Sequence, residues 1–450
     1  MQRNIKTVFL IPYFQIPGAC TSPIYVSTAG HDHIGCGRNL RSCCKTIDYT
    51  GNQIMENNDD LILVSASETQ PTIFPINATL ALNKNITVAS QVGQRTQQPV
   101  IQSFHRNDIH LFNANGKHPI ILNVTGIRFK NVGLIRGAFQ HVSISGCQFD
   151  STDNILNVTA ELFDTTLLIE SSMFANSSTV VNIDHRSIHH VDVSMKNSTS
   201  LHCGSVLSYK SSSERSGASH FSFRSSVFNG CYDRKGCISI QNENVEKEHG
   251  NVGNHNCTLL VEDCTIMKYM NVHGNGSITV NHCKNVEINK SIFKSNSGIE
   301  GAALYLRIGS PLGTVVIQNS SFERNTALRH GGAVIVFEVF LLNLTRCTFV
   351  QNVAKTGTGG AVIFANKYIT GTAYVDSSVF VNNAADGRIG GAIYASGKSS
   401  SLFVSDSSFI RNRARLVGGA VSSWTNFSSV NYVLPISYSY RQNKYQRVPL

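Results

Sequence analysis

A five-residue offset recurs along most of the chain, in which an apolar residue is followed five positions later by Phe or, once, by Ile. These second members are Phe129, Phe149, Phe174, Phe228, Ile266, Phe293, Phe322, Phe349, Phe380 and Phe409. Ser or Cys stands two positions before the second member in nine of the ten copies. Such a register means that one small structural unit is repeated and that each copy packs on the previous one, as in a solenoid.

The last five copies are the most regular. Each has Asn three residues after the Phe and then leads into a segment that contains Gly-Ala. The aromatic residues of these copies are Phe293, Phe322, Phe349, Phe380 and Phe409, and the asparagines are Asn296, Asn325, Asn352, Asn383 and Asn412. Successive Phe residues lie 29, 27, 31 and 29 positions apart. This spacing defines the length of the repeated unit.

Short alternating strands are expected before each Phe and after each Gly-Gly-Ala segment. A repeat of this length, with two or three such strands, is too short for a propeller blade. It suits one coil of a parallel β-helix. Each strand would then pair with its equivalent about 4.8 Å away in the next coil. We expect the Phe residues to stack inward. We expect the Asn residues to bond along a column at a turn with left-handed backbone, and Gly-Gly to supply turn dihedrals that a Cβ forbids.

The repeat extends backward with decreasing regularity and divides the chain. Residues 61–430 are predicted to form the β-helix, with the clearest repeats at 286–423, and about 10–15 coils in all. The interval from Phe174 to Phe228 is long enough for two coils, and residues 241–256 are predicted to be an inserted polar loop. Residues 1–20 have some features of a signal peptide. Residues 21–60 are predicted to form an N-terminal cap segment. Residues 431–450 are predicted to be an irregular tail, as in a truncated chain.

The combination of Gly-Gly-Ala-Ile/Val with Phe-x-x-Asn over residues 291–423 resembles the repeats of polymorphic outer membrane proteins. More broadly, the chain resembles the right-handed parallel β-helix of the pectin-lyase-like superfamily. The segment that begins at Ile24 and continues through Gly35-Cys-Gly37 resembles the opening of secreted β-helix domains. That resemblance implies a disulfide in the N-terminal cap between Cys36 and Cys44, although Cys43 stands where Pro is usual.

Cysteines and glycosylation sequons predict an oxidising, secretory route, since the chain has twelve cysteines and twelve Asn-x-Ser/Thr sequons. The favoured glycosylation candidates are Asn77, Asn85, Asn123, Asn157, Asn197, Asn256, Asn275 and Asn426. The sequons at Asn289 and Asn319 lie beside the small-residue position of the repeat, where a glycan is not expected to fit. The protein is therefore predicted to be secreted or displayed on a cell surface.

The remaining cysteines fall into two groups. Cys147, Cys264 and Cys347 take the position of the repeated Ser, which predicts buried thiols without a disulfide partner. Cys203, Cys231 and Cys237 lie in neighbouring turn segments, which predicts one disulfide within this trio; its connectivity stays open.

The charged residues favour few classes of partner. The net charge of +10 is spread along the chain, and the densest basic run is Arg411, Arg413 and Arg415, with Arg388 one repeat earlier. A basic face attracts acidic glycans or nucleic acid, although such runs are more often simply solvated. The sequence has no basic tract with interleaved aromatic residues, so a nucleic-acid groove is not expected. The sequence has no apolar run of about 18 residues, which a membrane-spanning helix requires, so no direct insertion into a membrane is expected.

Catalytic and metal-binding groups are not predicted with any specificity. His189 and His190 lie near Asp184 and Asp192, but adjacent residues of an extended strand point to opposite faces. Asp376 and Asp406 occupy nearby positions in consecutive coils and could form a small acidic pair, but solvated turn residues are the favoured interpretation. No Cys or His spacing suits a structural metal site, and no cofactor is expected.

The first hypothesis is a secreted or surface β-helix that serves in adhesion or recognition, or as a structural rod, without catalysis. Its partners would be carbohydrates or surface proteins. The alternative is a polysaccharide lyase or glycoside hydrolase acting on extracellular polysaccharide, and only the lyase would require calcium.

Overall fold

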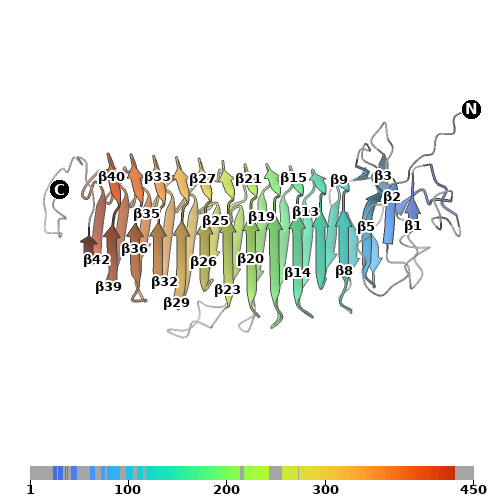
Figure 1. The fold of residues 1–450 in the computed structure, drawn as a ribbon, viewed down its shortest axis with the longest axis horizontal. Coiled ribbons are helices and arrows are strands. Elements are labelled where there is room, and N and C mark those ends of the chain that lie inside the picture. The colour runs from blue at the N-terminus through green and yellow to red at the C-terminus, as the bar shows by residue number, and fades with distance from the viewer. Residues whose placement is uncertain are drawn as a thin grey trace, which may run out of the picture.

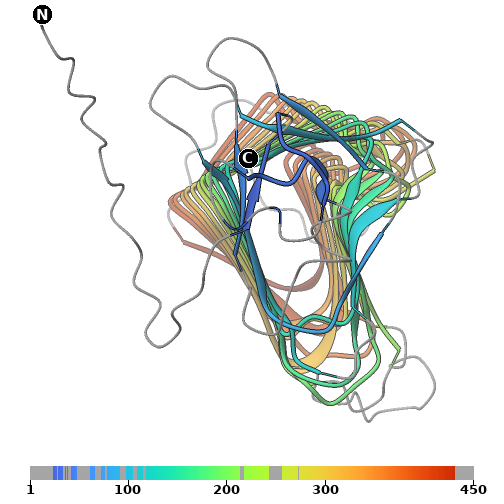
Figure 2. The ribbon, with the colours of Figure 1, turned by 90° about the vertical axis from the view of Figure 1, so that its right-hand side faces the viewer.

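The computed structural model describes residues 24–27, 29–33, 36, 38, 42–47, 61–65, 72–76, 79–91, 98–104, 109–114, 118–212, 217–242, 256–271 and 273–430. Their strands form one long rod, with the earliest strands at one end and the latest at the other (Figure 1). Viewed down its axis, the rod shows its coils superimposed around a common interior (Figure 2). The predicted signal peptide and the predicted C-terminal tail both lie outside the described residues.

Sheet B has thirteen strands and sheet C has five, and each strand contributes one rung. Sheet B contains β3 (Ile73–Ile76), β6 (Val100–Ser103), β9 (Arg128–Lys130), β12 (Gln148–Asp150), β15 (Met173–Ala175), β18 (Thr199–Leu201), β21 (Val227–Asn229), β24 (Thr265–Met267), β27 (Ile292–Lys294), β30 (Ser321–Glu323), β33 (Thr348–Val350), β37 (Val379–Val381) and β40 (Ser408–Ile410). Sheet C contains β28 (Ser297–Gly298), β31 (Thr326–Ala327), β34 (Val353–Ala354), β38 (Ala384–Ala385) and β41 (Arg413–Ala414).

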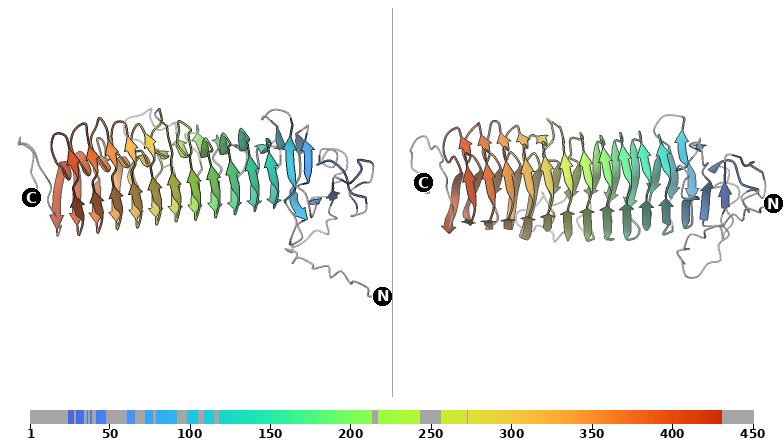
Figure 3. Two further views of the ribbon diagram at one scale, coloured as in Figure 1. Left: turned by 90° about the horizontal axis from the view of Figure 1, so that it is seen from above. Right: turned by 45° about the horizontal axis from the view of Figure 1, so that its top comes forward.

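Sheet A has 24 strands in two parallel rows, which are visible as long series of arrows in Figure 3. The first row contains β4 (Leu80–Leu82), β7 (His110–Ala114), β10 (Gly133–Gly137), β13 (Asn154–Ala160), β16 (Thr179–His185), β19 (Ser205–Ser211), β22 (Ile238–Asn242), β25 (Ile278–Asn281) and β35 (Val362–Ala365). The second row contains β1 (Ile24–Val26), β2 (Leu61–Ser65), β5 (Ile86–Gln91), β8 (Ile121–Thr125), β11 (His141–Ser145), β14 (Thr165–Glu170), β17 (Val191–Lys196), β20 (Ser219–Arg224), β23 (Cys257–Glu262), β26 (Asn285–Asn289) and β36 (Thr372–Asp376). Four strands contribute to both rows: β29 (Leu304–Gln318), β32 (Val334–Thr345), β39 (Ile393–Ser405) and β42 (Val421–Val430).

Every pairing between these strands is parallel and joins equivalent residues of successive coils. In sheet B, Phe322 pairs with Phe349 and Phe349 pairs with Phe380. The thirteen rungs of sheet B agree with the predicted 10–15 coils. The prediction of an all-β parallel β-helix is therefore confirmed.

The aromatic residues of the repeat form the predicted inner ladder. Phe293, Phe322, Phe349, Phe380 and Phe409 stack with ring centroids 4.7–4.9 Å apart and ring planes within 5° of parallel. Ser200 of β18 takes the ladder position between Phe174 and Phe228, so that the long interval between these two residues does hold two coils. The stacked rings fill the rod on the side of sheet B because each coil repeats the same inward position.

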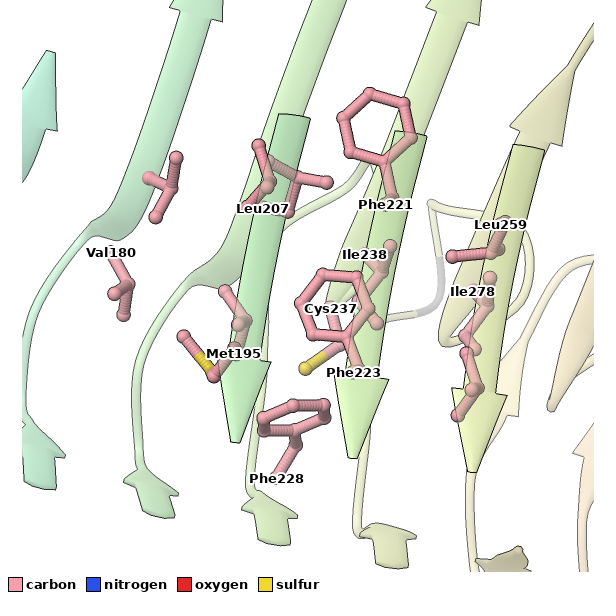
Figure 4. Packing of buried hydrophobic residues seen from close by; sticks show 14 of the residues in the cluster. Val180, Met195, Leu207, Phe221, Phe223, Phe228, Cys237, Ile238, Leu259 and Ile278 are labelled. Carbon is pink, nitrogen blue, oxygen red and sulfur yellow. The ribbon is translucent and has the colours of Figure 1, made fainter. Parts of the chain in front are cut away.

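The apolar residue five positions before the aromatic one also points inward, from the second row of sheet A. Phe223 and Phe228 illustrate this pair, with ring centroids 5.8 Å apart and planes at 90°. Figure 4 shows both rings packed with Met195, Leu207 and Cys237 in the interior. One apolar core thus runs along the rod, and burial of these side chains stabilises the stacking of coils.

The asparagines of the repeat form a buried hydrogen-bonded column. The Asn352 amide donates to the Phe322 carbonyl at 2.9 Å and to Asn383 Oδ1 at 3.0 Å. Its Oδ1 accepts from the Asn325 backbone N–H at 3.0 Å and from Asn325 Nδ2 at 2.9 Å. The column was predicted, but its backbone conformation was predicted wrongly. The left-handed residue is the one before each Asn, for example Asn382 with φ of 54°.

The two glycines of each Gly-Gly-Ala segment have different roles. Gly331 has φ of 58°, which only the absence of a Cβ makes inexpensive. A Cβ on Gly332 would collide with the Gly360 carbonyl oxygen in the next coil. The first glycine is required by its turn conformation and the second by the close approach of neighbouring coils.

The N-terminal end of the described rod carries the predicted disulfide. Cys36 is joined to Cys44, and both residues are buried with Ile24 of β1. The pairing that the family resemblance implied is confirmed. In the part of the chain that the structure describes, no helix has the length and apolar character that crossing a membrane requires.

The asparagine column yields a test of stability. Asn352→Ala leaves several buried donors and acceptors without their partner, and we expect a loss of about 2–4 kcal/mol in the free energy of unfolding. Urea unfolding followed by circular dichroism measures it. The matched control is Asn382→Gly, one coil later at an exposed left-handed position, with an expected change within about 0.5 kcal/mol. Equal losses in the two variants would contradict the role of the column.

Candidate functional site

A run of exposed basic side chains lies along sheet C and the turn that follows it. We call this surface the basic edge. It consists of the exposed residues Arg329, Lys355, Arg388, Arg413 and Arg415, which come from four successive coils. Arg413 begins β41, and the others lie in the turns between sheet C and the first row of sheet A.

The parallel stacking of coils brings these residues together. The Lys355 N–H donates to the Ala327 carbonyl, and the Arg415 N–H donates to the Ala385 carbonyl. The pairing of sheet C therefore continues one residue beyond its strands and places Lys355, Asp386 and Arg415 in one column. Successive members of such a column are about 4.8 Å apart along the rod.

Positive charge exceeds negative charge on this edge. Arg413 Nη2 lies 2.9 Å from Asp386 Oδ1, and among the described residues Arg413 is the only member of the basic edge that is joined to a carboxylate. Burial lowers the pKa of His330, and the charges of Arg388 and Arg329 lower it further, whereas Glu300 acts in the opposite direction.

The chemistry of this edge is that of anion binding. Guanidinium groups present several N–H donors in a planar fork, which suits carboxylate, sulfate and phosphate oxygens. Arg411, Arg413 and Arg415, with Arg388 one repeat earlier, were singled out in the sequence as a basic run. Arg411 is exposed but lies at the left-handed position between β40 and β41, so it is not part of the basic edge. Arg329 and Lys355 were missed because they are distant in sequence from that run and join it only through stacking.

The histidine cluster has a different arrangement from the predicted one. His189 and His190 lie in the turn between β16 and β17, not in an extended strand. His189 Nδ1 lies 3.6 Å from Asp164 Oδ1, and Asp184 pairs with Arg186 instead. No group of three or more His, Cys, Asp or Glu side chains within the described residues is placed to hold a metal ion.

A buried histidine of the same region is held by a polar network inside the core. His185 Nδ1 lies 2.6 Å from the Tyr209 hydroxyl, and His185 Nε2 lies 3.0 Å from the His189 carbonyl oxygen. The Tyr209 hydroxyl also lies 2.8 Å from Ser219 Oγ. Burial, the largest influence, lowers the pKa of His185 and raises that of Tyr209 to about 12. This network satisfies core polar groups and faces no surface.

The predicted acidic pair is not aligned. The in-register neighbour of Asp376 is Ser405, and Asp406 follows at a left-handed position. Asp376 accepts hydrogen bonds from Ser405 Oγ at 2.6 Å and Ser377 Oγ at 2.9 Å. These bonds lower the pKa of Asp376. The alternative of paired acids, which was not the favoured one, is therefore wrong, because Asp376 and Asp406 lie at different positions of the coil.

The cysteine trio contains one disulfide, between Cys231 and Cys237, and Cys203 is a buried thiol. The predicted thiols at Cys147, Cys264 and Cys347 are buried without a disulfide. Burial raises the pKa of Cys147 and Cys347 to about 11 and that of Cys264 to about 12. These thiols are poor nucleophiles at neutral pH.

A further disulfide, between Cys257 and Cys283, was missed in the sequence. Cys257 begins β23, and the Lys284 N–H donates to its carbonyl from the next coil. The separation of 26 residues is close to one repeat and was the available signal.

The glycosylation candidates differ in exposure. Asn85, Asn197 and Asn256 are exposed, whereas Asn123, Asn157 and Asn275 are half-buried. Asn77 and the side chain of Asn426 lie outside the described part. Asn319 is exposed and Asn289 is half-buried, and the Asn319 amide donates to Asn289 Oδ1 at 3.2 Å. Modification of these sequons stays a prediction. Of the polar loop predicted at 241–256, Gln241 and Asn242 belong to β22 instead, and residues 243–255 lie outside the described residues.

The parallel pairing of equivalent residues in successive coils places the chain in the class of parallel β-helix repeat proteins. No protein-family model matches the chain. Part of it is similar to the probable outer membrane protein pmp6 of Chlamydia pneumoniae, with 33% identity over 129 residues. This stretch is 25% of this chain and 10% of that protein, so the chain spans about a tenth of the length of this relative.

Two solved structures are distantly similar. The catalytic domain of a GH87 α-1,3-glucanase has a TM-score of 0.42 and 10% identity, covering 96% of this chain and 70% of that one. The GH136 lacto-N-biosidase of Eubacterium ramulus has a TM-score of 0.37 and 10% identity, covering 92% and 67%. No functional property is transferred from either.

The His185 network yields a test of pH dependence. Because the folded state lowers the pKa of His185, the unfolded chain binds the proton more readily, and the free energy of unfolding rises with pH. We expect this contribution to be complete above about pH 6.5 and to be lost as the pH falls below that value. Urea unfolding across this range measures it. His185→Gln should flatten the dependence, whereas His273→Gln at an exposed position should not; equal slopes in all three proteins would contradict the assignment.

Proposed function

We propose that this chain is a recognition rod of a secreted or surface glycoprotein, and that it binds an acidic extracellular glycan along the basic edge without catalysis. The observation that carries the proposal is the run of five exposed cationic side chains along four successive coils. Successive coils present Arg or Lys at neighbouring places, with one carboxylate, Asp386, among them.

A linear polyanion fits this arrangement better than a small anion does. The charges of the basic edge follow the rod axis and do not converge on one point, because each coil adds its own side chain about 4.8 Å from the last. Exposed cations interact weakly one at a time. A chain with repeated carboxylate or sulfate groups would engage several of them together and gain affinity through multivalency.

Other observations support an extracellular setting. Three disulfides occur among the described residues, and disulfides persist in oxidising compartments. The sequons and the limited similarity to a bacterial outer membrane protein agree with display outside the cytoplasm. The repeat motifs favour relationship to the polymorphic outer membrane proteins and to the pectin-lyase-like superfamily. Adhesion is then the role that a rigid rod with a charged edge serves best.

Charge reversal on the basic edge tests the proposal. The full chain is titrated against immobilised heparin and polygalacturonate, with neutral dextran as the blank. We expect Arg388→Glu with Arg415→Glu to weaken binding about tenfold or more, and binding of the parent protein to fall as salt rises. Lys130→Glu with Arg136→Glu is the matched control, since it makes the same change in net charge on distant exposed residues. Absence of binding to both polyanions, or equal weakening in the two double variants, would refute the proposal.

A further inference from the structure

Two aromatic side chains stack on the outside of the rod. Tyr374 of β36 and Phe403 of β39 are in-register neighbours in the second row of sheet A. Their ring centroids are 5.1 Å apart and their planes are 14° from parallel. Tyr374 is 44% exposed and Phe403 is 37% exposed. Unlike the Phe ladder of the interior, this pair keeps apolar surface in contact with water.

The same outward column changes character at Tyr374. The equivalent residues of the two preceding coils are Asn343 and Val316, which have smaller side chains. Phe403 covers one face of the Tyr374 ring, so its other face is directed along the rod toward the coil of Asn343. The surface therefore has a step, which we define as the place where the Tyr374 ring projects beyond the smaller side chain of Asn343 in the preceding coil.

The groups that flank the pair on its own strands are polar, and only one of them is charged. The outward residues that flank the pair on the same strands are Thr372, Asp376, Ser401 and Ser405. Asp376 is the only charged side chain among them, and its carboxylate accepts hydrogen bonds from Ser405 and Ser377. Thr345 and Asn343 add a hydroxyl and an amide from β32. The face thus complements a ligand that carries hydroxyl groups and no net charge.

The geometry points to a binding site for an uncharged saccharide at Tyr374 and Phe403, separate from the basic edge. The apolar C–H face of a pyranose ring packs against an aromatic ring, and its hydroxyl groups reach the surrounding amide and hydroxyl groups. A second copy of the chain suits this patch less well. The two rings expose together only about 150–200 Å², far below the roughly 800 Å² per partner of a stable dimer.

Titration calorimetry of the full chain with cellohexaose, maltohexaose and chitohexaose tests this site. We expect the parent protein to bind at least one of the three. Tyr374→Ala with Phe403→Ala should weaken that binding about tenfold or more. Tyr374→Phe keeps the ring and should leave the affinity within about threefold. Tyr232→Ala, which removes an exposed tyrosine elsewhere, and the double reversal at Arg388 and Arg415 should leave it unchanged.

Three results would overturn the inference. The first is absence of binding to all three hexasaccharides. The second is unchanged affinity in the Tyr374→Ala/Phe403→Ala variant, with its circular dichroism spectrum intact. The third is concentration-dependent self-association of the parent protein that the same variant abolishes in sedimentation velocity, because that result would assign the face to a second copy.

Discussion

The structure depends on parallel hydrogen bonding between equivalent residues of successive coils. Phe322 pairs with Phe349, and the same rule joins every strand of the three sheets to its equivalent. Once this register is set, any residue repeated at one position of the coil must form a column. The stacked Phe rings and the hydrogen-bonded Asn amides stabilise the same register, because a shift by one residue would turn each inward side chain to the opposite face.

The two proposed recognition surfaces follow from the same constraint. A substitution in one coil contributes a single side chain, whereas similar substitutions in neighbouring coils contribute a linear array. Lys355 and Arg415 are far apart in sequence and lie in one column, and Tyr374 and Phe403 are stacked although one whole repeat separates them. A β-helix can therefore vary its outer surface while its inner columns stay unchanged, which is how a regular scaffold acquires binding sites.

Sequence periodicity predicted the columns that repeat and little of what does not. Phe349 and Asn352 were placed correctly because every regular coil has an equivalent residue. The left-handed residue before each Asn was misplaced, since Ser, Arg, Gln and Asn all occur there and no residue type marks it. The disulfide of Cys257 with Cys283 and the joining of Arg329 to the basic run require knowledge of which residues stack. Asp376 and Asp406 do not pair because they stand four and three residues before their respective Phe, and the coils stack in register.

Engineered cross-linking tests the register most directly. Lys294 and Glu323 are in-register neighbours on the outer face of sheet B, 3.3 Å apart at their charged atoms. Replacing both by Cys should give an intramolecular disulfide, since adjacent strands place the Cα atoms about 5 Å apart. Lys294→Cys with Ser321→Cys is two residues out of register, at about 8 Å, and should not cross-link under the same mild oxidation. Cross-linking of the second pair and not the first, read by peptide mass spectrometry, would contradict the parallel in-register coil.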